Sequence, residues 1–144
     1  MTHPVTSRAH RIAEQAHAGQ TDKAGEPYIE HPRRVAAAVA HLGWEAEAAA
    51  VLHDVIEDSD HTADSLVAAT IPRNVATVVA LLTRRRAVAP ADYYAAIRRD
   101  PVALAVKLAD VADNADPARL SRLDGSTQDR LRSKYAAAVA ALTE

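Results

Sequence analysis

Residues 46–58 read AEAAAVLHDVIED, and the character of this stretch decides the fold class. Its apolar part lacks the alternation of a β-strand, and alanine, its commonest residue, is the strongest helix former. The whole chain is similar, since 49% of its residues are hydrophobic but only 3% are aromatic. Small side chains let helices approach one another closely. The sequence therefore predicts an all-α fold, a compact helical bundle.

Size and composition limit the organisation and the class of function. A chain of 144 residues has the size of one domain, so we expect a single domain over residues 1–144. The net charge of −2 gives no electrostatic basis for binding nucleic acid or an anionic membrane. The absence of cysteine excludes a thiol nucleophile and cysteine-based metal sites. Seven histidines instead favour nitrogen and oxygen ligands for any metal.

Targeting signals are absent from the pattern as well. No apolar run approaches the ~18 residues that span a bilayer, and the chain begins without the apolar stretch of a signal peptide. We therefore expect a cytoplasmic protein without nucleic-acid or membrane partners. Assembly into a homo-oligomer stays open.

Capping residues, prolines and glycines predict where the helices begin and end. Asp100 followed by Pro101, and Asp116 followed by Pro117, are strong helix starts. We expect helices over residues 6–18, 31–42, 44–58, 62–69, 72–83 and 91–99. Two further helices are expected to begin at residues 101 and 117, and a last helix, with Ser126 as its N-cap, to end at about residue 142. Residues 19–30 form a loop long enough to be functional. The three arginines at residues 84–86 indicate a solvated linker or, alternatively, contacts to substrate phosphates.

The end of the opening stretch carries the first candidate chemistry. Helical spacing would place His53 one turn from Glu57, and Asp54 one turn from Asp58. Three crowded carboxylates repel one another, and a divalent cation would remove that cost. A solvent-facing acidic helix end explains the same string, so these residues alone leave the choice open.

Two further segments add possible ligands. His31 begins a helix after the long loop, and Asp110 ends an apolar run with Lys107 and Asn114 on the same stripe. A buried carboxylate at Asp110 needs a partner, which could be a metal, Lys107 or an arginine from another helix. His3, His10, His41 and His61 show no such pattern and indicate surface or structural roles, and His17 fits helix packing as well as catalysis.

The order of His31, the His53–Asp54 pair and Asp110 resembles the signature of the HD phosphohydrolase superfamily. The chain resembles more closely the hydrolase domains of RelA/SpoT-type alarmone enzymes and the small alarmone hydrolases. The matching strings are AHAGQ at 16–20, GEPYIEHP at 25–32, VLHDVIED at 51–58, and VKLAD at 106–110 with Asn114. They occur in the family's order from about residue 9 to about residue 120.

The resemblance implies a helical bundle of the HD type and a role for each matching residue. One divalent ion, usually Mn²⁺ in this family, would be held by four ligands: His31, His53, Asp54 and Asp110. Glu57 and Asp58 match the pair that orients or activates the attacking water. Lys107 and Asn114 match residues near the substrate sugar or phosphates, and Lys23 and Tyr28 belong to the nucleotide pocket.

Three departures from the family concern the other end of the pocket. Asp22 precedes Lys23 where the family usually has an arginine that packs on the purine. Val111 stands where an arginine is usual, and residues 116–117 stand where a threonine is expected. The metal-binding set is complete, whereas base recognition is predicted to be altered.

We therefore expect a manganese-dependent enzyme that removes pyrophosphate from the 3′ position of an alarmone such as ppGpp. It is expected only to degrade, because the chain has no room for a synthetase domain. One alternative is an HD phosphohydrolase for another nucleotide: an adenine alarmone, NADPH or a nucleoside phosphate. A second is a non-catalytic nucleotide-binding module, against which the complete set of site residues argues.

Overall fold

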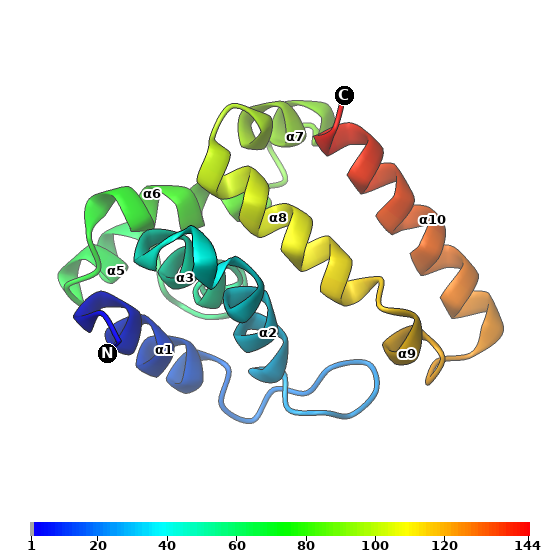
Figure 1. The fold of residues 1–144 in the computed structure, drawn as a ribbon, viewed down its shortest axis with the longest axis horizontal. Coiled ribbons are helices and arrows are strands. Elements are labelled where there is room, and N and C mark those ends of the chain that lie inside the picture. The colour runs from blue at the N-terminus through cyan, green and yellow to red at the C-terminus, as the bar shows by residue number, and fades with distance from the viewer. Residues whose placement is uncertain (1) are drawn as a thin grey trace.

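The computed structural model describes residues 2–144, so only Met1 of the predicted domain lies outside it. The predicted all-α fold is confirmed: the described residues form helices with no strand beyond an isolated bridge between Thr21 and Pro27 (Figure 1). The helices are α1 (Pro4–Ala16), α2 (Glu30–Val39), η1 (Ala40–Leu42), α3 (Trp44–Val51), α4 (Val55–Asp58), α5 (Ala63–Ala68), α6 (Arg73–Leu82), α7 (Pro90–Arg98), α8 (Pro101–Asn114), α9 (Pro117–Leu120) and α10 (Gly125–Leu142).

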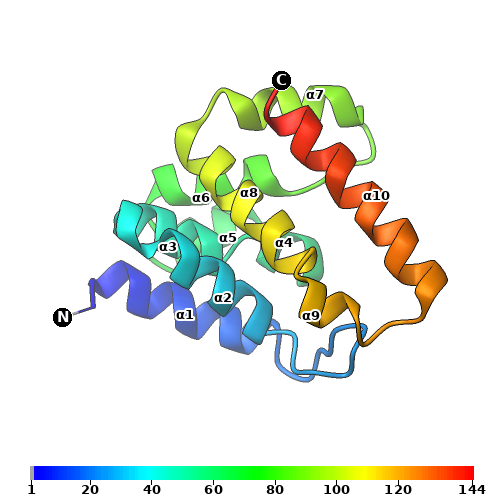
Figure 2. The same cartoon turned by 45° about the vertical axis from the view of Figure 1, so that its right-hand side comes forward.

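Helix α8 lies at the centre of the bundle. It packs against α2, α3 and α6 on one side and against α7 and α10 on the other. Figures 1 and 2 show α10 running beside α8, and α1, α2 and α3 on the side of α8 away from α10. The C-terminus lies beside α7. The long loop of residues 19–29 leads from α1 to α2 and lies at the same end as α9. Residues on α8 can therefore face both halves of the bundle.

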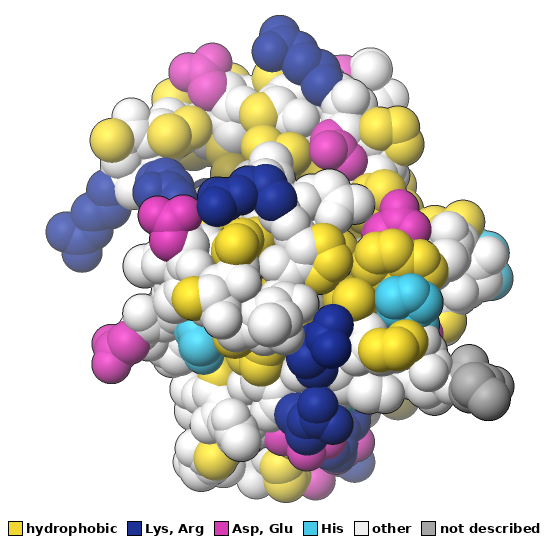
Figure 3. Space-filling view, turned by 90° about the vertical axis from the view of Figure 1, so that its left-hand side faces the viewer, with side chains coloured by type: hydrophobic (Ala, Val, Ile, Leu, Met, Phe, Trp, Pro, Cys, Tyr) yellow, Lys and Arg dark blue, Asp and Glu magenta, His cyan; other side chains and the backbone are white. Residues whose placement is uncertain are grey.

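Small side chains build the core, as the composition predicts. Ala48, Ala49 and Ala50 of α3 are fully buried, and so are Ala9 and Ala13 of α1. These alanines let α3 pack closely against α1 and α2. No helix among residues 2–144 is both long enough and apolar enough to cross a bilayer. On the face in Figure 3, lysine and arginine side chains are dispersed among acidic and apolar ones.

The predicted continuous helix over residues 44–58 is wrong, because α3 ends at Val51 and α4 begins at Val55. The His53 ring donates its Nδ1–H to the carbonyl oxygen of Ala50 at 2.6 Å, and the amide of Val55 bonds to the carbonyl of Leu52 at 2.9 Å. Such local bonds compete with the helical pattern. His53 and Asp54 consequently lie in a turn.

Helix ends elsewhere differ by smaller amounts. Asp100 and Asp116 cap α8 and α9 as predicted, and Thr62 caps α5. The predicted N-cap of the last helix is wrong, since Asp124, not Ser126, accepts the amide of Thr127 at 2.8 Å. A carboxylate one residue before Gly125 therefore starts α10 two residues earlier than predicted.

Candidate active site

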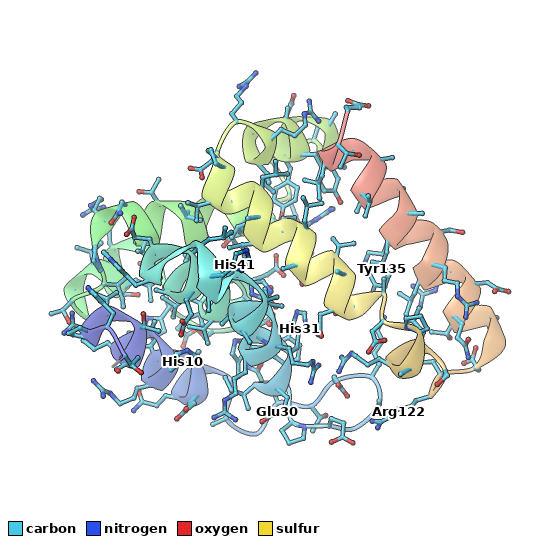
Figure 4. All side chains as sticks on the ribbon, in the orientation of Figure 1. His10, Glu30, His31, His41, Arg122 and Tyr135 are labelled. Carbon is cyan, nitrogen blue, oxygen red and sulfur yellow. The ribbon has the colours of Figure 1, made fainter. Side chains whose placement is uncertain are left out.

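Three elements bring the four predicted metal ligands together. His31 comes from α2, His53 and Asp54 from the turn between α3 and α4, and Asp110 from α8. The Nε2 atoms of His31 and His53 lie 2.9 Å and 3.4 Å from Oδ1 of Asp110. One ligand atom each from His31, His53 and Asp54 lies within 4.8 Å of the others. Figure 4 labels His31 where α2 faces α8.

The ring nitrogens of the two histidines are arranged as metal ligands require. The Nδ1–H group of His53 is held by the Ala50 carbonyl, and Nδ1 of His31 lies 2.7 Å from Oδ2 of Asp113. Each ring therefore turns its Nε2 atom inward. Nε2 of His53 is fully buried and makes no well-aligned hydrogen bond with the described residues, although Asp54 Oδ2 lies 3.1 Å away. A buried, unpaired nitrogen beside carboxylate oxygens fits a divalent cation.

The protonation states show strong electrostatic coupling at this centre. Burial lowers the pKa of His53, but Asp54 and Asp110 outweigh it and raise that pKa well above its usual value. Burial raises the pKa of Asp54, but His53 outweighs it and holds the pKa at about 2. Burial raises the pKa of Asp110, but the hydrogen bond with His31 and the nearby charges of His53 and Lys107 outweigh burial and hold that pKa far below its usual range. The carboxylates of Asp54 and Asp110 therefore favour a positive charge between them. In the structure the protonated imidazoles supply that charge, and a bound metal cation would supply it in their place.

Asp110 also has the polar neighbours predicted from the stripe on α8. The ammonium group of Lys107 lies 3.0 Å from Oδ2, and the Asn114 amide donates to Oδ1 at 3.1 Å. Asp110 raises the pKa of Lys107 against the opposing effect of burial, so the lysine is charged. The structure thus satisfies both interpretations of Asp110, as a partner of Lys107 and as a neighbour of the two histidines.

The long loop brings Tyr28 to the same centre. The Tyr28 hydroxyl donates to Oδ2 of Asp54, and burial together with the Asp54 charge raises its pKa far above the usual value. Oδ1 of Asp22 accepts the amides of Ala24 and Glu26, both at 2.9 Å, which closes the loop. Asp22 therefore shapes the segment that positions Tyr28.

Glu57 and Asp58 occupy different places. Glu57 lines a cavity of about 240 Å³ together with His53, Asp54 and Asp110, and its carboxylate accepts the amide of Arg84 at 3.1 Å. Asp58 is not among the residues that line this cavity. Burial, followed by the charges of Asp54 and Glu57, raises the pKa of Asp58.

The cavity has a basic and aromatic side that sequence reasoning largely missed. Besides Lys107, it is lined by Arg84 and Lys134 and by the rings of Tyr93, Tyr94 and Tyr135. The Arg84 guanidinium lies 4.9 Å from the Tyr93 ring centre and donates to the Tyr94 hydroxyl at 2.7 Å. Arg84 is exposed in the linker between α6 and α7 and also lines the cavity, and its contact with substrate phosphates stays a prediction. No motif marks Lys134, because only packing brings α10 to α8.

A second cavity of about 250 Å³ adjoins the first. Tyr28, Asn114 and Tyr135 line both cavities, and Lys23 lines the second together with Arg119. Leu120, Leu123 and Leu131 add an apolar wall. Nη2 of Arg119 lies 3.4 Å from Oδ2 of Asp22, so the predicted departure at Asp22 has a partner on α9. Neither Asp22 nor Arg119 is isolated in this pocket.

The other histidines have structural neighbours. His3 caps α1 and stacks on Trp44 with ring centres 4.2 Å apart, and His17 is buried with Nδ1 2.8 Å from the Gln20 side chain. His10 lies 3.2 Å from Glu47, and His61 lies 2.9 Å from Ser65. The contacts of His3, His10 and His61 agree with the surface or structural roles predicted for them, and for His17 the choice between helix packing and catalysis stays open.

Fold and site together define the class of protein. The family model of the HD domain matches residues 9–133, and the chain belongs to this family. It is 40% identical to a guanosine-3′,5′-bis(diphosphate) 3′-pyrophosphohydrolase of Haemophilus influenzae, in a match covering 72% of this chain and 17% of the relative. It is 33% identical to a GTP pyrophosphokinase of Streptomyces coelicolor, in a match that covers 74% of this chain and 14% of that relative. The chain thus spans less than a fifth of either relative.

A solved structure has the same fold. It is described as a metazoan ortholog of SpoT that hydrolyses ppGpp, and it superposes with a TM-score of 0.79. The superposition covers 99% of this chain and 87% of that one at 20% identity. At this identity the likeness concerns the HD fold itself.

Proposed function

We propose that this chain is a manganese-dependent phosphohydrolase that removes the 3′-pyrophosphate of (p)ppGpp, and that one domain over residues 1–144 carries the activity. One observation carries the proposal: His31, His53, Asp54 and Asp110 lie together, and the last three line a cavity that is also lined by Glu57 and three cationic side chains. The names of the relatives from Haemophilus influenzae and of the solved metazoan structure support the choice of substrate.

The metal would be held by the two imidazole nitrogens and by the carboxylates of Asp54 and Asp110. A bound divalent ion supplies Lewis acidity toward a phosphoryl oxygen and makes water easier to deprotonate. The mixed nitrogen and oxygen donor set suits Mn²⁺. Tyr28, which bonds to Asp54, helps to hold that carboxylate in place.

Glu57 is the proposed general base. In the reaction, a water oxygen bonds to phosphorus, the bond from phosphorus to the ribose 3′ oxygen breaks, and Glu57 accepts a proton from the water. The leaving 3′ oxygen takes up one proton, so that ppGpp and water yield GDP and pyrophosphate. Asp58 lies outside the cavity wall and is proposed to support Glu57 electrostatically.

The charged side of the first cavity suits a diphosphate. Arg84, Lys107 and Lys134 approach it from three different elements, and phosphate oxygens accept hydrogen bonds from such cations. The second cavity is proposed to hold the nucleoside, with Lys23 and Tyr28 at its walls and Asn114 near the sugar. Tyr28 and Asn114 line both cavities, so one nucleotide would span the two.

A second candidate keeps the chemistry and changes the base. Asp22 is engaged by two loop amides and by Arg119, which places a carboxylate at the wall of the proposed nucleoside pocket. This favours an altered preference, for example for an adenine alarmone, NADPH or a nucleoside phosphate. A cytoplasmic location and assembly into a homo-oligomer stay predictions.

The test is the release of pyrophosphate from guanosine and adenosine 3′-diphosphate nucleotides, with Mn²⁺ and with a chelator. We expect pyrophosphate to be released from the guanosine compound when Mn²⁺ is present and not when the metal is removed by the chelator. A clear preference for the adenosine compound would favour the second candidate. Binding of nucleotide by the metal-loaded protein without any release would identify a non-catalytic module and overturn the proposal.

A further inference from the structure

Asp113 contacts a candidate metal ligand from the side away from the metal. It lies on α8 three residues after Asp110, and its Oδ2 is 2.7 Å from Nδ1 of His31. The other ring nitrogen of His31 faces Oδ1 of Asp110 at 2.9 Å. Two carboxylates of one helix thus hold the two nitrogens of the same ring.

Arginines hold Asp113 in turn. Arg34, one turn along α2 from His31, donates from Nε to Oδ1 at 2.8 Å and from Nη2 to Oδ2 at 3.2 Å. Nε of Arg119 lies 4.0 Å from Oδ2. The side chain of Asp113 is 13% exposed, so water contributes little to this network.

The chemistry of imidazole gives this contact a consequence. A carboxylate that accepts Nδ1–H orients the ring and fixes the tautomer whose Nε2 lone pair is free to bind a metal. Arg34 donates to both carboxylate oxygens of Asp113, so the acceptor of the His31 ring is itself held by a cation. In His53 the Ala50 carbonyl has the corresponding role, but it carries no full charge.

We propose that Asp113 is a positioning residue of the metal centre, which raises metal affinity by fixing the ring of His31 without ligating the ion itself. The inference rests on the metal site of the proposed function and adds a residue outside the predicted set. Through Arg119 and Asp22 the same network reaches the loop that carries Lys23 and Tyr28.

The test measures the Mn²⁺ dissociation constant from the spin-resonance signal of free Mn²⁺. Asp113→Ala is expected to weaken binding about 10–100-fold, the range for an outer-shell partner of a ligating histidine. Asp113→Asn is expected to weaken it less, because the amide oxygen still accepts Nδ1–H. The matched control is Asp129→Asn, which removes one exposed carboxylate on α10 and leaves the constant within about twofold, since the site is untouched.

A double-mutant cycle separates positioning from general structural damage. If Asp113 acts through His31, Asp113→Ala has no further effect on Mn²⁺ binding in a His31→Ala background. Equal effects in both backgrounds would overturn the inference, as would wild-type affinity in both Asp113 variants. Should Asp113→Ala lose its helical circular dichroism, Asp113→Asn decides alone.

Asp110→Ala separates the positioning role of Asp113 from the metal site itself. Loss of Mn²⁺ binding in Asp110→Ala together with wild-type binding in the Asp113 variants would reject only the positioning role. Unchanged binding in Asp110→Ala would reject the metal site of the proposed function itself.

Discussion

Asp54 contacts both a second candidate ligand and the long loop. Oδ2 of Asp54 lies 3.1 Å from Nε2 of His53 and accepts a hydrogen bond from the Tyr28 hydroxyl. Asp54 lies in the turn between α3 and α4, as the N-cap residue of α4. Because of this turn, the side chains of His53 and Asp54, which are adjacent in sequence, both lie at the candidate metal site. As a proposed ligand, Asp54 is the residue whose loss should affect the metal site most directly.

Replacing Asp54 by Ala is therefore expected to abolish metal-dependent turnover. Mn²⁺ binding should weaken by more than about 100-fold, which exceeds the loss expected for an outer-shell partner. The measurement is Mn²⁺ titration together with pyrophosphate release. Turnover that still depends on Mn²⁺ in this variant would show that Asp54 is not a ligand.

Replacing Glu57 by Gln tests the general base. The side chain keeps its size and loses the ability to accept a proton, so kcat should fall about 10²- to 10⁴-fold while Mn²⁺ affinity is kept. Asp58→Asn is the matched control, since Asp58 does not line the cavity, and its kcat should fall less. A normal kcat in Glu57→Gln beside a large loss in Asp58→Asn would reverse the assignment.

At the scale of elements, the loop of residues 19–29 depends on Asp22. This residue accepts two amides within the loop and pairs with Arg119 on α9, and it was predicted from sequence only as a departure in base recognition. Its contacts assign it a second task, which is to close the loop and tie it to α9.

Asp22→Ala is expected to lower the free energy of unfolding by about 1–3 kcal/mol, because two hydrogen bonds from backbone amides and one ion pair are lost. Arg122→Ala is the control. Arg122 pairs with Glu26 at 3.2 Å, but both are more than half exposed, so a change below about 0.5 kcal/mol is expected. Urea unfolding checks both, and an equal loss in the two variants would contradict the role of Asp22.

The helix ends show which local signals sequence carries. Asp100, Asp116 and Thr62 cap their helices as predicted, because capping depends on residues within one turn. The break after Val51 could not be predicted from periodicity, since it depends on the His53 ring bonding to the Ala50 carbonyl. The same ring lies against His31 of α2 and Asp110 of α8, which are distant in the sequence.

At the scale of the whole molecule, the buried charges couple stability to pH. Net interactions with carboxylates raise the pKa of both His31 and His53 although burial opposes them. The stabilisation is therefore full below the unfolded value near 6.5 and is lost as pH rises through the folded values. Asp54 and Asp113, with pKa values of about 2, stabilise above about pH 3.9, and this stabilisation is lost as pH falls toward 2.

Chelator-treated protein is accordingly expected to be more stable at pH 5.5 than at pH 8.5. Mn²⁺ should reverse this order, because its ligands must be deprotonated, and an excess of 100 times the dissociation constant adds about 2.7 kcal/mol. Urea unfolding at both pH values, with chelator and with Mn²⁺, checks the prediction. His41→Gln, at an exposed position, should keep the same profile. Higher stability of the chelated protein at pH 8.5 would contradict it.

The sequence by itself determined the all-helical class, most helix starts and the identity of the candidate ligands. Alanine content and capping act locally, and the matching strings preserve the order of His31, His53, Asp54 and Asp110. The tertiary structure alone decided that Asp113 holds His31, that Arg84 and Lys134 share a cavity with Glu57, and that Asp22 meets Arg119. These contacts join residues from different segments, up to 97 positions apart in the chain, so only the packing of the helices and of the long loop brings them together.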